Sequence, residues 1–169
     1  MTNTVNLAEK FANSEKFKVL FQDGMNLVEE SATYLDGSGR DHAKTLSRTA
    51  AMLYGSESMR LTTRLMQLAS WLLLQRAANE GEMSREQLLE EKSKIKLGET
   101  THKTDHPSWN ELPKDFVELV SRSLILQNRV ITLDAELYGS RSEESKSKAK
   151  NPVEQQIELL STALGATKQ

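Results

Sequence analysis

The chain has 169 residues, with 22 basic and 24 acidic side chains, a formal net charge of -2 and no cysteine. Its length suits a single domain around one hydrophobic core, and the near balance of charge argues against the basic face that nucleic-acid-binding proteins need. The absence of cysteine excludes disulfides and thiolate metal sites.

The sequence has no sign of a signal peptide or a membrane span. Its first residues, MTNTVNLAEKFANSEKF, are polar and mixed in charge. The longest apolar stretch, residues 65–74, is interrupted by Gln67 and Ser70 and is about half of the ~20 residues needed to cross a bilayer. We therefore expect a cytoplasmic protein that binds neither membrane nor nucleic acid.

Three prolines, eight glycines and 5% aromatic residues favour helices over sheet. We expect an all-α protein, with a three-helix bundle over residues 1–139, a long central helix and a flexible C-terminal tail. The first helix is expected at about residues 14–35, where apolar residues recur every three or four positions. Gly24 lies on this stripe, where it either lets a neighbouring helix approach closely or is a neutral substitution. The sequence DGSGR at 36–40 is expected to end this helix in a polar loop, with Gly37 in the left-handed conformation.

The central helix is expected from about residue 45 to 80, with no proline, Gly55 as a weak point and Gly81 at its end. Its second half is apolar around most of its circumference, so it must be covered on more than one side. Two neighbours in a three-helix monomer would leave part of it exposed, which indicates a partner and first of all a second copy. The residues assigned to this combined core and dimer interface are Met59, Leu65, Met66, Leu68, Trp71, Leu72 and Leu74.

Three charged residues of the same helix, Glu57, Arg60 and Arg64, share one face at spacings of three and four. One interpretation is a solvated strip of ion pairs beside the core, which is favoured because charge runs are usually solvated. The other is a docking surface for an acidic or phosphorylated partner, because guanidinium groups bind carboxylates and phosphates through paired hydrogen bonds.

A mobile segment is expected at residues 82–112, where Ser84 and Gln87 resemble a capping box that would start a short helix. The third bundle helix is expected at about residues 113–138, because Pro113 suits a first helical turn.

The tail, residues 140–169, begins with a polar linker that cannot bury enough apolar area to fold. It is expected to end in a short amphipathic helix at about 152–164, which would be marginal alone in water. That helix either docks on the bundle or binds a partner groove. Its apolar face consists of Val153, Ile157, Leu160 and Leu164.

No pattern supports catalysis, a metal site or a cofactor. His102 and His106 are four residues apart, as two metal ligands on a helix would be, but His106 precedes Pro107, a position that disfavours helix. Solvated loop histidines are the favoured interpretation. The Glu-x-x-His pairs of di-metal bundles are absent, and nothing fixes a serine–histidine–acid set. We expect a protein that is not an enzyme and holds no cofactor or metal.

Two segments, FKVLFQDGMNLVEESATYLDGSGR (17–40) and ESMRLTTRLMQLASWLLLQRAANEGEM (57–83), closely resemble the alphaproteobacterial family named regulator of CtrA degradation (RcdA). The resemblance is strong over the first two expected helices, weaker over the third, and one of general character in the tail. It implies a dimeric three-helix bundle with a flexible C-terminal tail.

The resemblance also implies an adaptor for regulated proteolysis. In that family the response-regulator-like protein CpdR primes the ClpXP protease, and the family member then delivers substrates or recruits PopA, a cyclic-di-GMP-binding adaptor that brings the cell-cycle regulator CtrA. The expected partners are therefore primed ClpXP, a PopA-like adaptor, protein substrates and a second copy of the chain. The alternative is a structural or self-assembling bundle without a proteolytic role.

Overall fold

The computed structural model describes residues 14–98 and 105–139. The chain divides into two units, Met1–Leu133 and Asp134–Gln169, and each is described by itself. The helices of the first unit are α2 (Glu15–Asp36), α3 (Ser38–Lys44), α4 (Arg48–Asn79), α5 (Arg85–Ser93), the 3-10 helix η1 (Pro107–Glu111) and α6 (Lys114–Asp134). The second unit begins with a π-helical turn, η2 (Ala135–Gly139). No strand occurs in the described residues, and the expected all-α class is confirmed.

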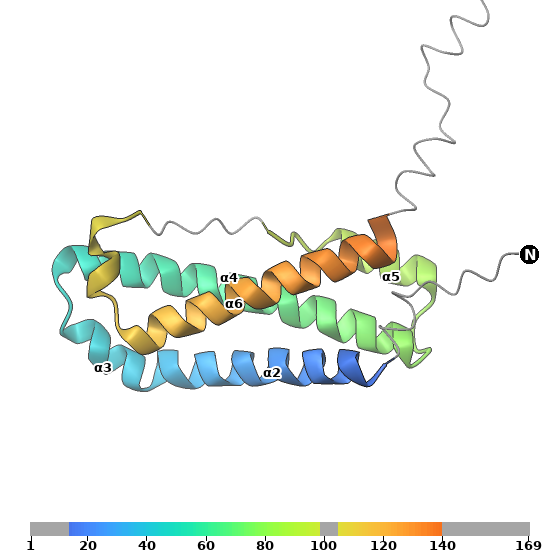
Figure 1. Ribbon diagram of the computed structural model, residues 1–169, viewed down its shortest axis with the longest axis horizontal. Helices are drawn as coiled ribbons and strands as arrows, with labels where there is room; N and C mark the ends of the chain where they lie inside the picture. Colours follow the sequence, from blue (N-terminus) through green and yellow to red (C-terminus); the bar gives the residue numbers. More distant parts are fainter. Residues whose placement is uncertain (1–13, 99–104, 140–169) are drawn as a thin grey trace, which may run out of the picture. The chain divides into compact units, whose positions relative to one another are not determined.

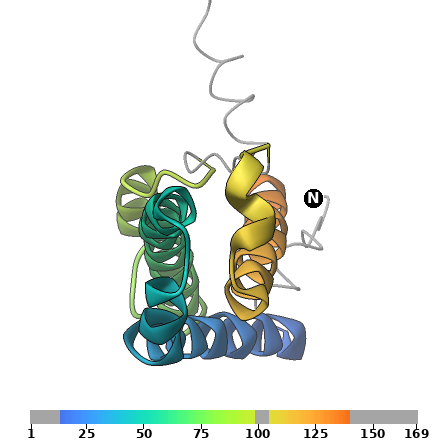
Figure 2. The same ribbon diagram turned by 90° about the vertical axis from the view of Figure 1, so that its left-hand side faces the viewer.

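Three long helices, α2, α4 and α6, form the bundle, and α2 lies along one side of the α4 and α6 pair in both views (Figures 1 and 2). The longest is α4, with 32 residues, or about 48 Å at 1.5 Å per residue. The short helix α3 connects the end of α2 to the start of α4, and α5 packs against α4. The expected three-helix bundle with a long central helix is confirmed.

The limits of α4 and α5 follow from capping residues. The Ser47 side chain accepts a hydrogen bond from the Ala50 N–H (3.2 Å), so α4 begins at Arg48 rather than at residue 45. Its end is marked by Gly81 in the left-handed region, with φ of 74°. Ser84 forms the expected capping box at the start of α5.

The first helix ends at Asp36, but the polar loop expected at residues 36–40 is not formed, because residues 38–40 already begin a helix, α3. Gly37 does end α2, and its N–H donates to the Thr33 and Tyr34 carbonyl oxygens. Its φ of -108° is not in the left-handed region. Gly39 then packs against the core, where an added Cβ would lie 2.6 Å from the Tyr54 hydroxyl oxygen. A tight tertiary contact therefore stabilises this short helix, and such a contact leaves no periodic signal in the sequence.

Aromatic rings join the three long helices at the end of the bundle near α3. The ring centroid of Phe116 on α6 lies 4.6 Å from that of Tyr54 on α4 and 6.4 Å from that of Tyr34 on α2. The Tyr34 hydroxyl is also 3.1 Å from His42 Nδ1. This cluster holds α3 and the first turn of α6 to the core.

A short helix and the third bundle helix complete the first unit. The polar loop expected before the third helix contains η1, where His106 Nδ1 accepts a hydrogen bond from the Ser108 N–H at 3.1 Å. The third helix, expected at about residues 113–138, is α6 from Lys114 to Asp134, and a π-helical turn follows it to Gly139.

Candidate protein-binding surface

The leucine stripe of α4 belongs to the core. Leu65, Leu68 and Leu72 are buried, and Leu74 is half-buried. Trp71 is only 1% exposed, and Lys92 on α5 places its Nζ 4.3 Å from the indole centroid. Lys92 also donates to Gln75 Oε1 at 2.8 Å. Within the described residues, the chain itself therefore covers four members of the predicted core and dimer set: Leu65, Leu68, Trp71 and Leu72.

The opposite side of α4 carries large apolar side chains that the described residues do not cover. Met52, Met59, Met66 and Leu73 are between 52% and 74% exposed, and they recur every seven residues. We call these four residues the methionine ridge. Apolar residues seven apart align along one side of a helix and form a seam when another helix packs on it. A contiguous exposed ridge of this kind indicates a protein interface.

The other exposed residues of α4 between Met52 and Leu73 are uncharged. They are small or polar: Gly55, Ser56, Thr62, Thr63 and Ser70. Methionine side chains are flexible and polarisable, and they adapt to different partner surfaces. The ridge therefore combines adaptable apolar side chains with small or polar neighbours that allow a partner helix to approach closely.

Sequence reasoning identified Met59 and Met66 as interface residues but did not include Met52 or Leu73. The signal that could have found them is the seven-residue period, which continues through all four positions.

Two of the three charged residues on this face of α4 are inside the bundle, where neither interpretation of their spacing would place them. Glu57 and Arg64 are 1% and 0% exposed, and only Arg60, which forms an ion pair with Glu57, reaches solvent. Arg64 Nη1 donates a 2.8 Å hydrogen bond to the Ser123 hydroxyl of α6. Glu57 and Arg64 share the helical face of buried Leu61, so they form neither a solvated strip nor a docking surface.

Burial lowers the pKa of the Arg64 guanidinium, whereas the Glu57 carboxylate acts in the opposite direction. A guanidinium still stays charged in a protein interior. Arg64 is therefore a buried charge that the bundle holds in place, and its role is structural.

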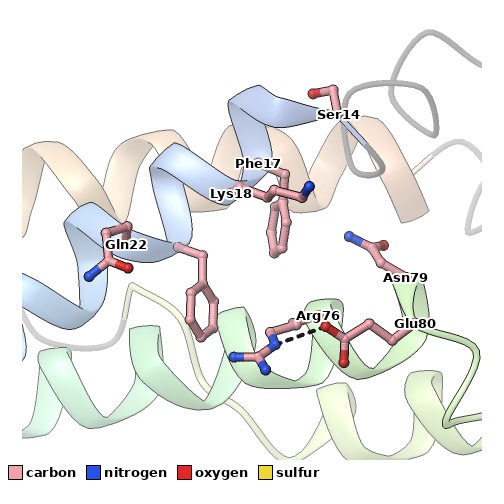
Figure 3. Close-up of a pocket in the computed structure, with 8 residues that line it drawn as sticks. Ser14, Phe17, Lys18, Gln22, Arg76, Asn79 and Glu80 are labelled. Carbon is pink, nitrogen blue, oxygen red and sulfur yellow. Dashed lines mark hydrogen bonds and ion pairs between the residues drawn. The ribbon is translucent and has the colours of Figure 1, made fainter.

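A hollow of about 420 Å³ lies between the start of α2 and the end of α4 (Figure 3). Phe17 and Phe21 form its apolar wall, with Lys18 and Glu80 at the edge. The Arg76 guanidinium lies 5.0 Å from the Phe21 ring centroid, and its Nε is 3.1 Å from Glu80 Oε1. Because this cation is engaged on two sides, the hollow offers a partner little unpaired charge.

Residues 14–98 and 105–139 contain no group of three histidine, aspartate or glutamate side chains placed to hold a metal ion. None of the helices in these ranges is long and apolar enough to span a bilayer. The predicted docking residues Val153, Ile157, Leu160 and Leu164, and His102, lie outside the described residues.

Comparison with known proteins relates the chain to a family model and to a solved structure. Residues 8–164 match a family described as protein of unknown function (DUF1465). Among solved structures, the chain is similar to the crystal structure of RcdA from Caulobacter crescentus CB15. The two share 48% sequence identity with a TM-score of 0.61, over 74% of this chain and 92% of that one. No curated protein matches the chain.

Proposed function

Because the chain belongs to the RcdA family, we propose that it is a non-enzymatic adaptor in cell-cycle-regulated proteolysis. In this role it tethers substrates or further adaptors to ClpXP in the CtrA degradation pathway of the cytoplasm. Its partners are ClpXP primed by CpdR, a PopA-like adaptor and protein substrates. The observation that carries the proposal is 48% identity to RcdA over 92% of that chain.

Tethering alone can accelerate degradation of a substrate without any chemistry by the adaptor. A protein that binds both protease and substrate turns their encounter into an intramolecular event, which raises avidity by a factor of about 10²–10⁴. The exposed methionine ridge supports this role, because it gives the chain an apolar surface beyond the needs of its own core. The tail residues Val153, Ile157, Leu160 and Leu164 are a second proposed docking element.

We also propose that the ridge mediates self-association. In an antiparallel pair of α4 helices, Met59 of one copy would face Met66 of the other, and Met52 would face Leu73. Both pairs share one midpoint, between Thr62 and Thr63, so a single twofold axis satisfies them. Small side chains beside the ridge favour a close approach of the two helices.

The adaptor role is tested with purified ClpXP, CpdR, a PopA-like adaptor and a CtrA substrate. Adding the full chain should accelerate loss of CtrA, and a chain lacking residues 140–169 should do so less. If the full chain binds none of these proteins and leaves the rate unchanged, the alternative of a structural or self-assembling bundle is favoured.

A further inference from the structure

Gly55 lies in the interior of α4, about two turns from its start, and no contact among the described residues requires a glycine there. A glycine in a helix interior lowers stability by roughly 0.5–1 kcal/mol relative to alanine. Gly24 and Gly39 are explained by contacts, because a Cβ at either would lie within 2.6 Å of Leu72 or Tyr54 atoms. At Gly55 an added Cβ would meet no atom of residues 14–98 and 105–139 within 4 Å. The missing side chain therefore leaves space on the outside of the helix.

That space belongs to an open groove of about 690 Å³ between α3 and α4, with Leu35 of α2 at its edge. Ala43 and Met59 give it apolar walls, and Met59 joins it to the methionine ridge. The groove is largely open to solvent, unlike small-molecule sites, which enclose most of their ligand. Its form suits a helix or extended segment of another protein.

The charged residues that line the groove are basic, and each is paired with an aspartate just outside the lining. Arg40 and Lys44 of α3 line it, and none of its lining residues is acidic. Arg40 forms an ion pair with Asp36 at the end of α2 at 3.4 Å, and Lys44 forms one with Asp41 of its own helix at 3.1 Å. These pairs are more than 70% exposed, and such pairs contribute little to stability. A carboxylate from a partner can therefore compete with Asp36 and Asp41 for these two cations.

We propose that this groove is a docking site for an acidic amphipathic helix of a protein partner. The apolar face of that helix packs over Gly55 and against Met59, and its flanking carboxylates pair with Arg40 and Lys44. Because Met59 also belongs to the methionine ridge, this helix and a second copy of the chain compete for the same part of α4. A second copy bound through the exposed face of α4 does not supply these charges, because the exposed residues from Met52 to Leu73 include no carboxylate. That the occupant is a protein segment rests on the proposed adaptor function.

The test uses two synthetic fluorescent helical peptides with the same leucine face, one flanked by glutamates and the other by lysines. Binding to the full chain is followed by fluorescence anisotropy at low and high salt. The acidic peptide should bind at least about tenfold more tightly than its lysine twin, and added salt should reduce the difference. Equal binding of the two peptides, or no binding of either, would overturn the proposal.

Three variants locate the binding. Arg40→Glu with Lys44→Glu should reverse the preference between the peptides, whereas Lys94→Glu, at an exposed lysine paired with Glu91, should leave it unchanged. Gly55→Leu should abolish binding without lowering the melting temperature, since leucine favours helix more than glycine.

If Gly55→Leu still binds the acidic peptide, the groove is not the site. If Gly55→Leu abolishes self-association while the wild-type chain binds neither peptide, the groove belongs to a second copy. Peptide binding is measured without ClpXP, so this result and the result of the degradation assay are independent.

Discussion

The guanidinium of Arg64 on α4 donates a 2.8 Å hydrogen bond to the Ser123 hydroxyl on α6, inside the bundle. Ser123 in turn donates to the Val120 carbonyl oxygen at 2.7 Å. Nε and Nη2 of Arg64 have no hydrogen-bond partner among the described residues. One serine thus provides the link between a buried charge and the neighbouring helix, and its loss leaves that charge less well satisfied.

We predict that Ser123→Ala lowers the free energy of unfolding by about 1–3 kcal/mol, because it leaves a buried charged donor without its acceptor. Urea denaturation of the wild-type chain and of Ser123→Ala measures the difference in the free energy of unfolding. In an Arg64→Met background the same serine change should cost less than about 1 kcal/mol, since no guanidinium remains to be satisfied. An equal cost in both backgrounds would show that the hydrogen bond is not responsible.

Trp71 is the largest of the fully buried side chains, so Trp71→Ala should lower the free energy of unfolding by about 3–5 kcal/mol. The measurement is a denaturant titration at fixed protein concentration. Trp109 in η1 is only half-buried, and Trp109→Ala serves as a matched control with a smaller expected loss. A negligible shift for Trp71→Ala would contradict its burial against Lys92 and the core.

Much of the fold was predictable from the sequence because it depends on periodicity and capping. The buried leucine stripe of α4, the capping box at Ser84 and the left-handed Gly81 all follow from local patterns. Helix α3 was missed because the contact that stabilises it, Gly39 against Tyr54, joins residues distant in sequence.

The candidate surface was harder to predict, since spacing identifies residues that share a face but not which face is buried. Glu57 and Arg64 were taken for surface residues because charged residues usually are, yet α6 covers Arg64 and provides Ser123. Met59 and Met66 were assigned to a combined core and interface, and the structure leaves both exposed.

Two glycines of the bundle should respond in opposite ways to alanine. Gly55→Ala should raise the free energy of unfolding by about 0.5–1 kcal/mol, because alanine favours helix and the site is open. Gly24→Ala should lower it by about 1–3 kcal/mol, because the new Cβ would lie 2.5 Å from Leu72 Cδ1 in a packed core. Thermal and urea unfolding of both variants check the signs. Stabilisation by Gly24→Ala would contradict the close approach of α2 and α4.

Tyr34 should make the bundle sensitive to alkali. Burial, then the nearby Tyr54 and Asp115, raises the pKa of its phenol from 10.0 to about 12. Below pH 10 the Tyr34 phenol keeps its proton in both the folded and the unfolded chain, so its contribution to the free energy of unfolding is complete there. Between about pH 10 and 12 the unfolded chain loses the proton first, and the free energy of unfolding should fall by about 2–3 kcal/mol.

Urea unfolding across this pH window, with tyrosinate absorbance followed in parallel, measures the loss. Tyr34→Phe should weaken the pH dependence, although the pKa of Tyr54 is also raised by burial and leaves a smaller slope. An unchanged slope in Tyr34→Phe would assign the alkaline loss to other groups.

The methionine ridge should determine self-association. Replacing both Met59 and Met66 with glutamate should shift the chain to a monomer in sedimentation experiments, because like charges would face each other across the seam. Ile125 on α6 is 60% exposed, and Ile125→Glu is the matched control, expected to leave the association state unchanged.

Orientation can be tested with one further variant, Met59→Glu combined with Met66→Lys. In the proposed antiparallel pair each glutamate faces a lysine of the other copy, so this variant should still associate, and more weakly at high salt. In a parallel pair glutamate would face glutamate and lysine would face lysine, and the variant should be monomeric. A monomer in this experiment would contradict the antiparallel arrangement, whereas association of the double-glutamate variant would show that the ridge is not the interface.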